Sequence, residues 1–261
     1  VKKIIIDDEE FFEIPNNKIN YNYLIIEIKF ICFSNKIWKY LKDGFNKNYL
    51  TINNLYCSSY VRSSNYSNLF NEFNKKIILD IGYRKSAINV FQGSRILYFN
   101  ILPVGGKHIT NDISILLKID PGEAETIKKN LNQTETTFVK KEHKTNDFNS
   151  SDLSNEIIHA RVDEIIKLNL ADEYFNKFFK NIDTCVLIFI GEGSKILNNN
   201  SIYLEEKFDF FSKISFFEEN TTSICDSGFN FNQSGKFQEV NFLQKKSKNK
   251  GFFEKFFHFF R

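Results

Sequence analysis

The sequence contains no methionine and begins at Val1. A natural start codon leaves a methionine unless it is trimmed, so we expect a fragment that lacks its beginning. Only four cysteines are present, Cys32, Cys57, Cys185 and Cys225, and no two of them are close in sequence. This spacing argues against a zinc site or a disulfide framework and favours a reducing compartment.

Long apolar stretches are also missing. The longest wholly apolar run, "CVLIFI", is far shorter than the roughly 20 residues that a transmembrane helix needs. No signal-peptide pattern is present either. A protein of this kind that meets a membrane is therefore expected to lie on its surface. The hydrophobic content of 42% is still enough for a real core, in one large domain or two smaller ones.

The end of the chain, "KNKGFFEKFFHFFR", places six phenylalanines within nine residues. At about 100° per residue, all six fall within an arc of roughly 160° on one helix face. Residues 236–261 carry seven Lys/Arg against two Asp/Glu, whereas the whole chain has a net charge of only +3. An apolar face beside basic residues suits an anionic membrane, and packing against the protein's own core is the alternative. The residues predicted to bind membrane are Phe252, Phe253, Lys255, Phe256, Phe257, Phe259, Phe260 and Arg261.

The first part of the chain alternates strand-like and helix-like patterns. Residues 23–34 combine β-branched and aromatic side chains and predict a strand. Apolar residues at helical spacing follow over 35–45, and residues 49–57 predict a second strand. These elements form a small strand–helix–strand unit, and residues 63–74 are predicted to be a polar connector.

The second part of the chain predicts a larger α/β unit. Strands are expected at 77–81, 87–91 and 95–102, the last two joined by a tight hairpin at Gln92-Gly93. The expected helices cover 104–117, the segment after Pro121-Gly122, and the amphipathic stretch 151–179. "CVLIFI" is expected to be a buried strand that leads into a glycine turn and a helix, and a polar linker is expected after Phe229.

Two glycine-containing motifs follow predicted strands. "IILDIGYRKSAINVF" places Asp80 and Gly82 at a strand end, where backbone N–H groups wrap a phosphate in some kinase folds. "VLIFIGEGSKIL" ends a wholly apolar strand in G-x-G-S before a helix, which allows close backbone approach and favours anions. The alternative is that both are simply tight turns.

In chain order, "LPVGGKHITNDISILLKIDPGEAETIK", "EIIHARVDEII", "LIFIGEGSKI" and the phenylalanine helix resemble the FtsA family. These are actin-like proteins that tether the bacterial division ring to the membrane. The resemblance covers about residues 20–261 and implies an actin-like (ribonuclease H-like) α/β fold, preceded by a small strand–helix–strand domain. The implied divisions are 1–65 (small α/β domain), 66–235 (actin-like half, with 111–181 as an inserted helical subdomain), 236–250 (basic linker) and 251–261 (membrane-targeting amphipathic helix).

The resemblance also implies a nucleotide cleft, with ATP and Mg²⁺ as the expected cofactors. The matching residues are Gly82, Arg84, Lys85 and Ser86 for the second phosphate loop, Gly105 and Gly106 for the cleft floor, Glu125 and Lys128 for ribose and base, and Gly191, Gly193, Ser194 and Lys195 for the adenosine loop. The family usually has "DIGGGTTDI" where this chain has "DIGYRKSAI", and the first phosphate loop is absent. We therefore expect no enzymatic activity and assign no catalytic or metal-ligating residue.

The partners follow from the same resemblance. The helix containing Arg161 and Glu164 is expected to grip the C-terminal tail of FtsZ, although an exposed intrahelical ion pair is the alternative. Self-association into filaments, anionic lipids and later division proteins are further expected partners, and nucleic acid is not. The implied function is an adaptor at the cytoplasmic face of the bacterial inner membrane, at the septum. The alternative is an actin-fold ATPase whose turnover drives assembly.

Overall fold

The computed structural model describes residues 3–11, 20, 22–28, 30–131, 150–170, 185–198, 201–209 and 211–234. Within these ranges the chain forms one three-stranded sheet and one five-stranded sheet. The predicted basic linker and terminal phenylalanine helix lie outside the described residues. No helix in the described ranges has the length and apolar character needed to cross a bilayer.

The N-terminal sheet has the order β2-β1-β3, with antiparallel pairing throughout. Its strands are β1 (Lys3–Ile6), β2 (Glu9–Phe11) and β3 (Leu24–Glu27). The helix predicted next is confirmed as α1 (Asn35–Asn46), whose first turn is capped by the Ser34 hydroxyl accepting from the Lys36 N–H. The strand predicted at 49–57 is wrong. That segment forms no ladder and leads instead into the next helix, with Tyr56 packed edge-on against Phe231 at 5.4 Å.

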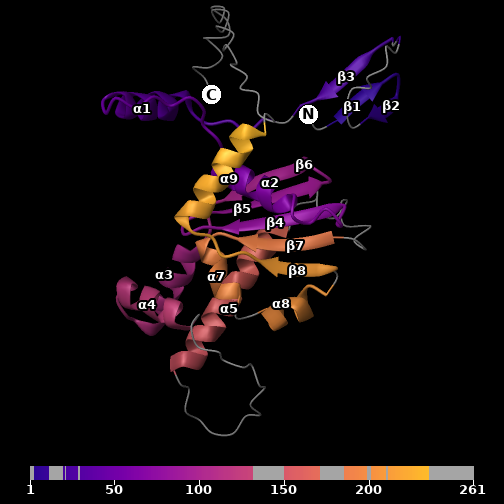
Figure 1. The fold of residues 1–261 in the computed structure, drawn as a ribbon. Helices are drawn as coiled ribbons and strands as arrows, with labels where there is room; N and C mark the ends of the chain where they lie inside the picture. Colours follow the sequence, from indigo (N-terminus) through magenta and orange to yellow (C-terminus); the bar gives the residue numbers. More distant parts are fainter. Residues whose placement is uncertain are drawn as a thin grey trace, which may run out of the picture.

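The five-stranded sheet has the order β6-β5-β4-β7-β8 and forms the centre of the molecule (Figure 1). An antiparallel meander builds one half, and two strands parallel to β4 build the other half. The strands are β4 (Lys75–Ile81), β5 (Ser86–Gln92), β6 (Arg95–Leu102), β7 (Cys185–Ile190) and β8 (Lys213–Phe216). The predicted strands and the β5–β6 hairpin are confirmed. Its turn residues are Gly93, at φ +59°, and Ser94, because Gln92 still pairs with Arg95.

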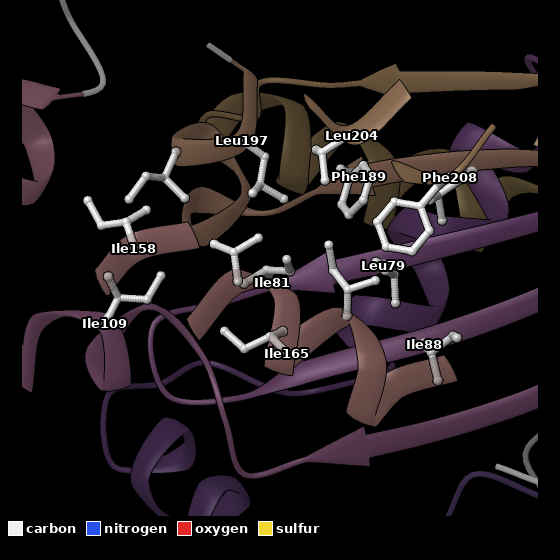
Figure 2. Packing of buried hydrophobic residues seen from close by; sticks show 14 of the residues in the cluster. Leu79, Ile81, Ile88, Ile109, Ile158, Ile165, Phe189, Leu197, Leu204 and Phe208 are labelled. Atoms are coloured by element: carbon white, nitrogen blue, oxygen red, sulfur yellow. The ribbon is translucent and has the colours of Figure 1, made fainter. Parts of the chain in front are cut away.

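One face of the sheet is covered by helices that belong mainly to the segment between β6 and β7. Alternate residues of β4, including Leu79 and Ile81, point into this layer and pack against Ile109 and Ile165 (Figure 2). The helices concerned are α3 (Gly106–Leu117), α4 (Pro121–Leu131), α5 (Ser150–Leu170), α7 (Lys195–Asn198) and α8 (Ser201–Lys207). The first three confirm the predicted helices within the described residues, because α5 is described only to Leu170.

The opposite face carries α2 (Ser58–Ser67) and α9 (Thr221–Gln233), which lie against each other (Figure 1). Tyr66 of α2 packs there with Ile78, Val186 and Ile188 of the sheet. The polar connector predicted from residue 63 is therefore wrong over the end of α2, and the linker predicted after Phe229 is wrong over residues 230–233, which belong to α9. Serine-rich and asparagine-rich composition suggested loops, but packing against the sheet stabilises helices here. The domain boundaries themselves stay predictions.

Candidate functional site

Three separate glycine segments converge where β4 and β7 end. We call Gly82, Gly105, Gly106, Gly191 and Gly193 the glycine cluster. The Gly106 N–H donates to the Gly82 carbonyl at 3.0 Å. A Cβ added to Gly106 would lie 3.8 Å from the Gly193 Cα. The structure therefore brings the predicted second phosphate loop, cleft floor and adenosine loop into direct contact.

The backbone geometry of this cluster requires glycine. A Cβ at Gly105 would lie 2.4 Å from the Gly82 carbonyl oxygen, and one at Gly193 would lie 2.7 Å from the Ile81 carbonyl oxygen. Gly191 has φ +89°, a conformation that side-chain-bearing residues rarely adopt. The N–H groups of Gly82, Gly105, Gly106 and Gly191 all donate within the protein, to Lys85, His108, Gly82 and Glu219. A phosphate that binds these N–H groups must therefore replace one of these hydrogen bonds.

The turn after β7 is held by its own serine. The Ser194 hydroxyl donates to the Gly191 carbonyl at 2.7 Å, and the Ser194 N–H donates to the same oxygen at 3.1 Å. Ser194 is buried, so its side chain shapes the turn from inside, and Lys195 follows as the first residue of α7. The geometry supports a structural role for Ser194, and its predicted contact with adenosine stays a prediction.

The β4–β5 turn presents cations to solvent. The Gly82 N–H donates to the Lys85 carbonyl at 2.9 Å, which closes the turn and leaves Tyr83, Arg84 and Lys85 exposed. Ser86, in contrast, is buried, and its hydroxyl accepts a 3.0 Å hydrogen bond from the side-chain amide of Asn169 on α5. Arg84 and Lys85 can thus neutralise a phosphate, whereas Ser86 faces the helix layer.

Lys128 and Glu125 on α4 form a closed polar network beside the glycine cluster. The Lys128 ammonium donates to the Glu125 carboxylate at 2.6 Å, to the Thr110 hydroxyl at 2.8 Å and to the Gly106 carbonyl at 3.2 Å. An ammonium has three donors, so a ligand that binds Lys128 must replace one of these bonds. The Tyr83 ring lies 5.8 Å from the same ammonium.

This network sets the ionisation of Glu125. Burial disfavours its charged form, but hydrogen bonds from Lys128 and Thr110 and the Lys128 charge hold the pKa of Glu125 below its ordinary value. A lowered folded-state pKa means that Glu125 contributes stability above its unfolded-state pKa and loses it as the pH falls through the folded-state value.

Replacing Lys128 by Met is expected to raise the pKa of Glu125 and to lower the free energy of unfolding by about 1 kcal/mol. Carboxyl ¹³C NMR titration measures the first effect and urea unfolding the second. Lys129→Met is the matched control, because the Lys129 ammonium lies 3.7 Å from the other Glu125 oxygen and is largely exposed. Equal shifts in the two variants would contradict the network.

A buried charge cluster that the sequence did not predict lies on the α2 side of the glycine cluster. The Arg62 guanidinium donates to Asp80 at the end of β4 and to Glu219, just before α9. The Glu219 side chain is 1% exposed and also accepts the Gly191 N–H at 3.0 Å. Burial beside this carboxylate raises the pKa of Tyr66 to about 12. Asp80 was noted as a strand-end residue, but Arg62 falls just before the predicted connector, within the unpredicted α2.

Arg161 and Glu164 lie one turn apart on α5, as predicted. The Arg161 guanidinium donates to both Asp112 oxygens on α3, at 2.5 and 3.0 Å, and to Glu164. The hydrogen bond to Asp112 raises the pKa of Arg161. The intrahelical pair therefore exists, extended by Asp112, and a role in binding a partner stays a prediction. The predicted membrane-binding residues lie outside the described residues.

Among the described residues there are groups that suit the nucleotide of the expected cofactor but none that we assign to its metal ion. The exposed side chains of Arg84 and Lys85, beside the glycine cluster, suit the phosphates of a nucleotide. No group of three or more His, Cys, Asp or Glu side chains within the described ranges is arranged to hold a metal ion, so we assign no residue to Mg²⁺. Asp80, which lies near the end of β4 just before the β4–β5 turn, is paired with Arg62.

The chain is similar in sequence to known cell division proteins. The family model described as "Cell division protein FtsA" matches residues 77–228, more than half of the chain. The cell division protein FtsA of Bacillus subtilis is 34% identical over 102 residues, which covers 35% of this chain and 23% of that protein. The match thus spans about a quarter of the length of this curated relative.

The fold has solved counterparts. MreB5 of Spiroplasma citri, in structures bound to ADP and to AMPPNP, superposes with TM-scores of 0.56 and 0.54 at 14% sequence identity. Each match covers 77% of this chain and 66% of the MreB5 chain. At this identity the likeness shows the fold alone, and it confirms the predicted actin-like α/β class.

Proposed function

This chain belongs to the FtsA family of actin-like cell division proteins, and on that premise we propose that it acts as an adaptor at the membrane. In this proposal the folded part contacts the division ring, and the C-terminal segment binds lipid at the cytoplasmic face of the inner membrane, at the septum. The observation that carries the proposal is the family match over 77–228, which includes every segment of the glycine cluster.

We further propose that the glycine cluster binds ATP or ADP without sustained turnover. The MreB5 structures contain ADP and AMPPNP in the same fold. In this chain Tyr83 and Arg84 place side chains where the family has glycines, which alters the phosphate geometry. Hydrolysis requires the γ-phosphate to be held in position for attack, and the side chains of Tyr83 and Arg84 alter the loop proposed to hold it. Magnesium-dependent phosphate release by this chain on liposomes would favour the alternative of an ATPase.

The proposed lipid contact predicts a large effect of charge on the phenylalanine face. Replacing Phe256 and Phe257 together by Glu is expected to abolish co-sedimentation with anionic phosphatidylglycerol vesicles, because two anions then face acyl chains and acidic headgroups. His258→Glu is the control variant, because His258 falls on the other face of the predicted helix, and it is expected to keep most of its binding. Undiminished pelleting of the double variant would refute the anchor.

The proposed contact with the FtsZ tail predicts an effect at Arg161. Replacing Arg161 by Glu is expected to weaken binding of an FtsZ tail peptide about tenfold, through loss of a charged contact. Asp112→Asn is an informative control, because it removes the internal partner of Arg161 and is expected to leave binding unchanged or tighter. Fluorescence anisotropy titration measures both, and an unaltered curve for Arg161→Glu would remove this residue from the site.

Two further partners complete the proposal. Copies of the protein are proposed to self-associate into filaments, so that many weak lipid contacts act together through avidity. Later division proteins are proposed to be recruited to such filaments. Size measurement of vesicle-bound protein tests the first of these ideas, because independent monomers on the vesicle would contradict it.

A further inference from the structure

The buried charge cluster of Arg62, Asp80 and Glu219 touches the turn that follows β7. The Gly191 N–H donates to Glu219, and a Cβ at Gly191 would lie 2.6 Å from an Asp80 carboxylate oxygen. The Gly191 peptide is therefore in contact with both carboxylates. Because the side chains of Asp80 and Glu219 are 8% and 1% exposed, little water is available to replace a lost protein contact.

The same cluster is joined directly to α9. Glu219 precedes Asn220, whose side-chain oxygen accepts the Ser223 N–H at 2.8 Å and thereby begins α9. Further along, α9 packs against α2, the helix that carries Arg62. The α2–α9 contacts include the Asn65–Ser227 side-chain hydrogen bond at 3.3 Å and the ring contact of Tyr60 with Phe231, and Tyr56, just before α2, contacts the same ring. One guanidinium thus links the glycine turn, α2 and the start of α9.

This arrangement favours transmission of movement. A shift of the Gly191 peptide removes a hydrogen bond from a buried carboxylate, and that carboxylate is also a partner of Arg62. A buried charge that loses a partner costs free energy in a low-dielectric interior. The Gly191 turn, Glu219 and Arg62 therefore move together rather than separately. The α9 helix is the last described element before the segment proposed to reach the membrane.

We propose that Arg62 and Glu219 are positioning residues that fix the Gly191 turn and transmit its conformation to α9. The claim that a bound nucleotide changes the turn, and through it α9, rests on the proposed nucleotide site. The claim that the Gly191 turn and α9 are coupled rests on the geometry alone. The two claims can be tested separately.

The first experiment needs no ligand and uses hydrogen–deuterium exchange of the full chain. Gly193→Ala disturbs the turn, because its new Cβ would meet the Ile81 carbonyl oxygen at 2.7 Å. We expect the amides of α9 to exchange about tenfold faster in this variant, within the usual range of coupling between contacting residues. In a Glu219→Leu background, which leaves Arg62 and Asp80 paired, the same change is expected to alter α9 exchange less than about twofold.

Two controls keep this result interpretable. Gly44→Ala, a glycine of α1 with no atom near its added Cβ, is expected to leave α9 unchanged. Amides of β4 and β7 report whether each variant keeps its core, and Arg62→Met supplies a second background if Glu219→Leu does not fold. An equal effect of Gly193→Ala with and without Glu219 would overturn the proposal.

The second experiment adds ADP or AMPPNP. In the otherwise unchanged chain, nucleotide is expected to slow exchange in α9, and in Glu219→Leu it is expected to bind without that effect. Protection of α9 by nucleotide in both chains would overturn the proposal. If neither nucleotide binds the unchanged chain, the proposed nucleotide site is wrong, and the ligand-free comparison alone decides the role of Glu219.

Discussion

Replacing Arg62 by Met is expected to lower the free energy of unfolding by about 3–5 kcal/mol, the usual effect of removing one partner from a buried ion pair. Arg62 is the described cation that contacts both Asp80 and Glu219. Methionine fills a similar volume without charge, so the two carboxylates would then face each other across a dry contact. Urea unfolding followed by circular dichroism measures the loss.

The pH dependence of that variant gives a second readout. Burial raises the pKa of Glu219 above its ordinary value, and the Arg62 charge opposes this. A raised folded-state pKa means that the folded chain binds more protons than the unfolded chain. Stability is therefore fully present below the unfolded-state pKa and falls as pH rises through the folded-state value. Without Arg62 the pKa of Glu219 rises further, so the loss of stability with rising pH is expected to be larger. The stability of Arg62→Met is therefore expected to be closer to that of the unchanged chain at about pH 5 than at about pH 7.5.

A more exposed ion pair serves as the control for Arg62. The Lys207 ammonium donates to Asp163 between α8 and α5, where the side chains are 28% and 18% exposed. Lys207→Met is expected to lower the free energy of unfolding by only about 1 kcal/mol. Equal losses in the two variants would contradict the view that the Arg62 cluster is the more strongly desolvated of the two.

Replacing Gly191 by Ala is expected to have the second-largest effect, a loss of about 3 kcal/mol in the free energy of unfolding. Alanine is strained at φ +89°, and its Cβ would lie 2.6 Å from an Asp80 oxygen and 2.7 Å from the Ile81 carbonyl oxygen. Because a main-chain oxygen of the central strand cannot swing away as a flexible side chain does, β4 itself must shift. The urea midpoint reports the change.

Gly228 is a glycine whose replacement by alanine is expected to stabilise the folded chain. Gly228 lies within α9, and apart from its chain neighbours and the backbone of the helix itself nothing lies within 4 Å of an added Cβ. Gly228→Ala is therefore expected to raise the free energy of unfolding by up to about 1 kcal/mol, through helix propensity. A loss of stability in Gly228→Ala, or no loss in Gly191→Ala, would show that local packing around these glycines differs from the structure.

The strands β4, β5, β6 and β7 were predictable because they carry strong local patterns, whereas the edge strand β8 was not predicted. β7 is entirely apolar, as a strand buried on both faces should be, and Gly93 marks the hairpin between β5 and β6. The glycine cluster was predictable in its residues through family resemblance. That Gly82, Gly106 and Gly193 touch one another is a tertiary fact, which only the folded chain supplies.

The elements that the sequence did not predict are those that depend on distant partners. α2 has a polar composition, and its helix is stabilised by Tyr66, which packs against strands that follow it in the sequence. Without α2, nothing in the sequence connects Arg62 with Glu219, more than 150 residues later. The same limitation hid the burial of Ser86 and Ser194, because a serine in or just after a glycine-containing turn is assigned to the loop whether its hydroxyl faces solvent or the protein interior.

The pairing of β4 with β7 has a consequence for biosynthesis. Lys75 is aligned with Cys185, about 110 residues later, whereas β5 and β6 follow β4 at once. As the chain leaves the ribosome, the meander can form early, but one edge of β4, a strand that is almost wholly buried in the folded protein, stays unpaired until β7 emerges. We expect this interval to be when the nascent chain is most prone to aggregate and most dependent on chaperones.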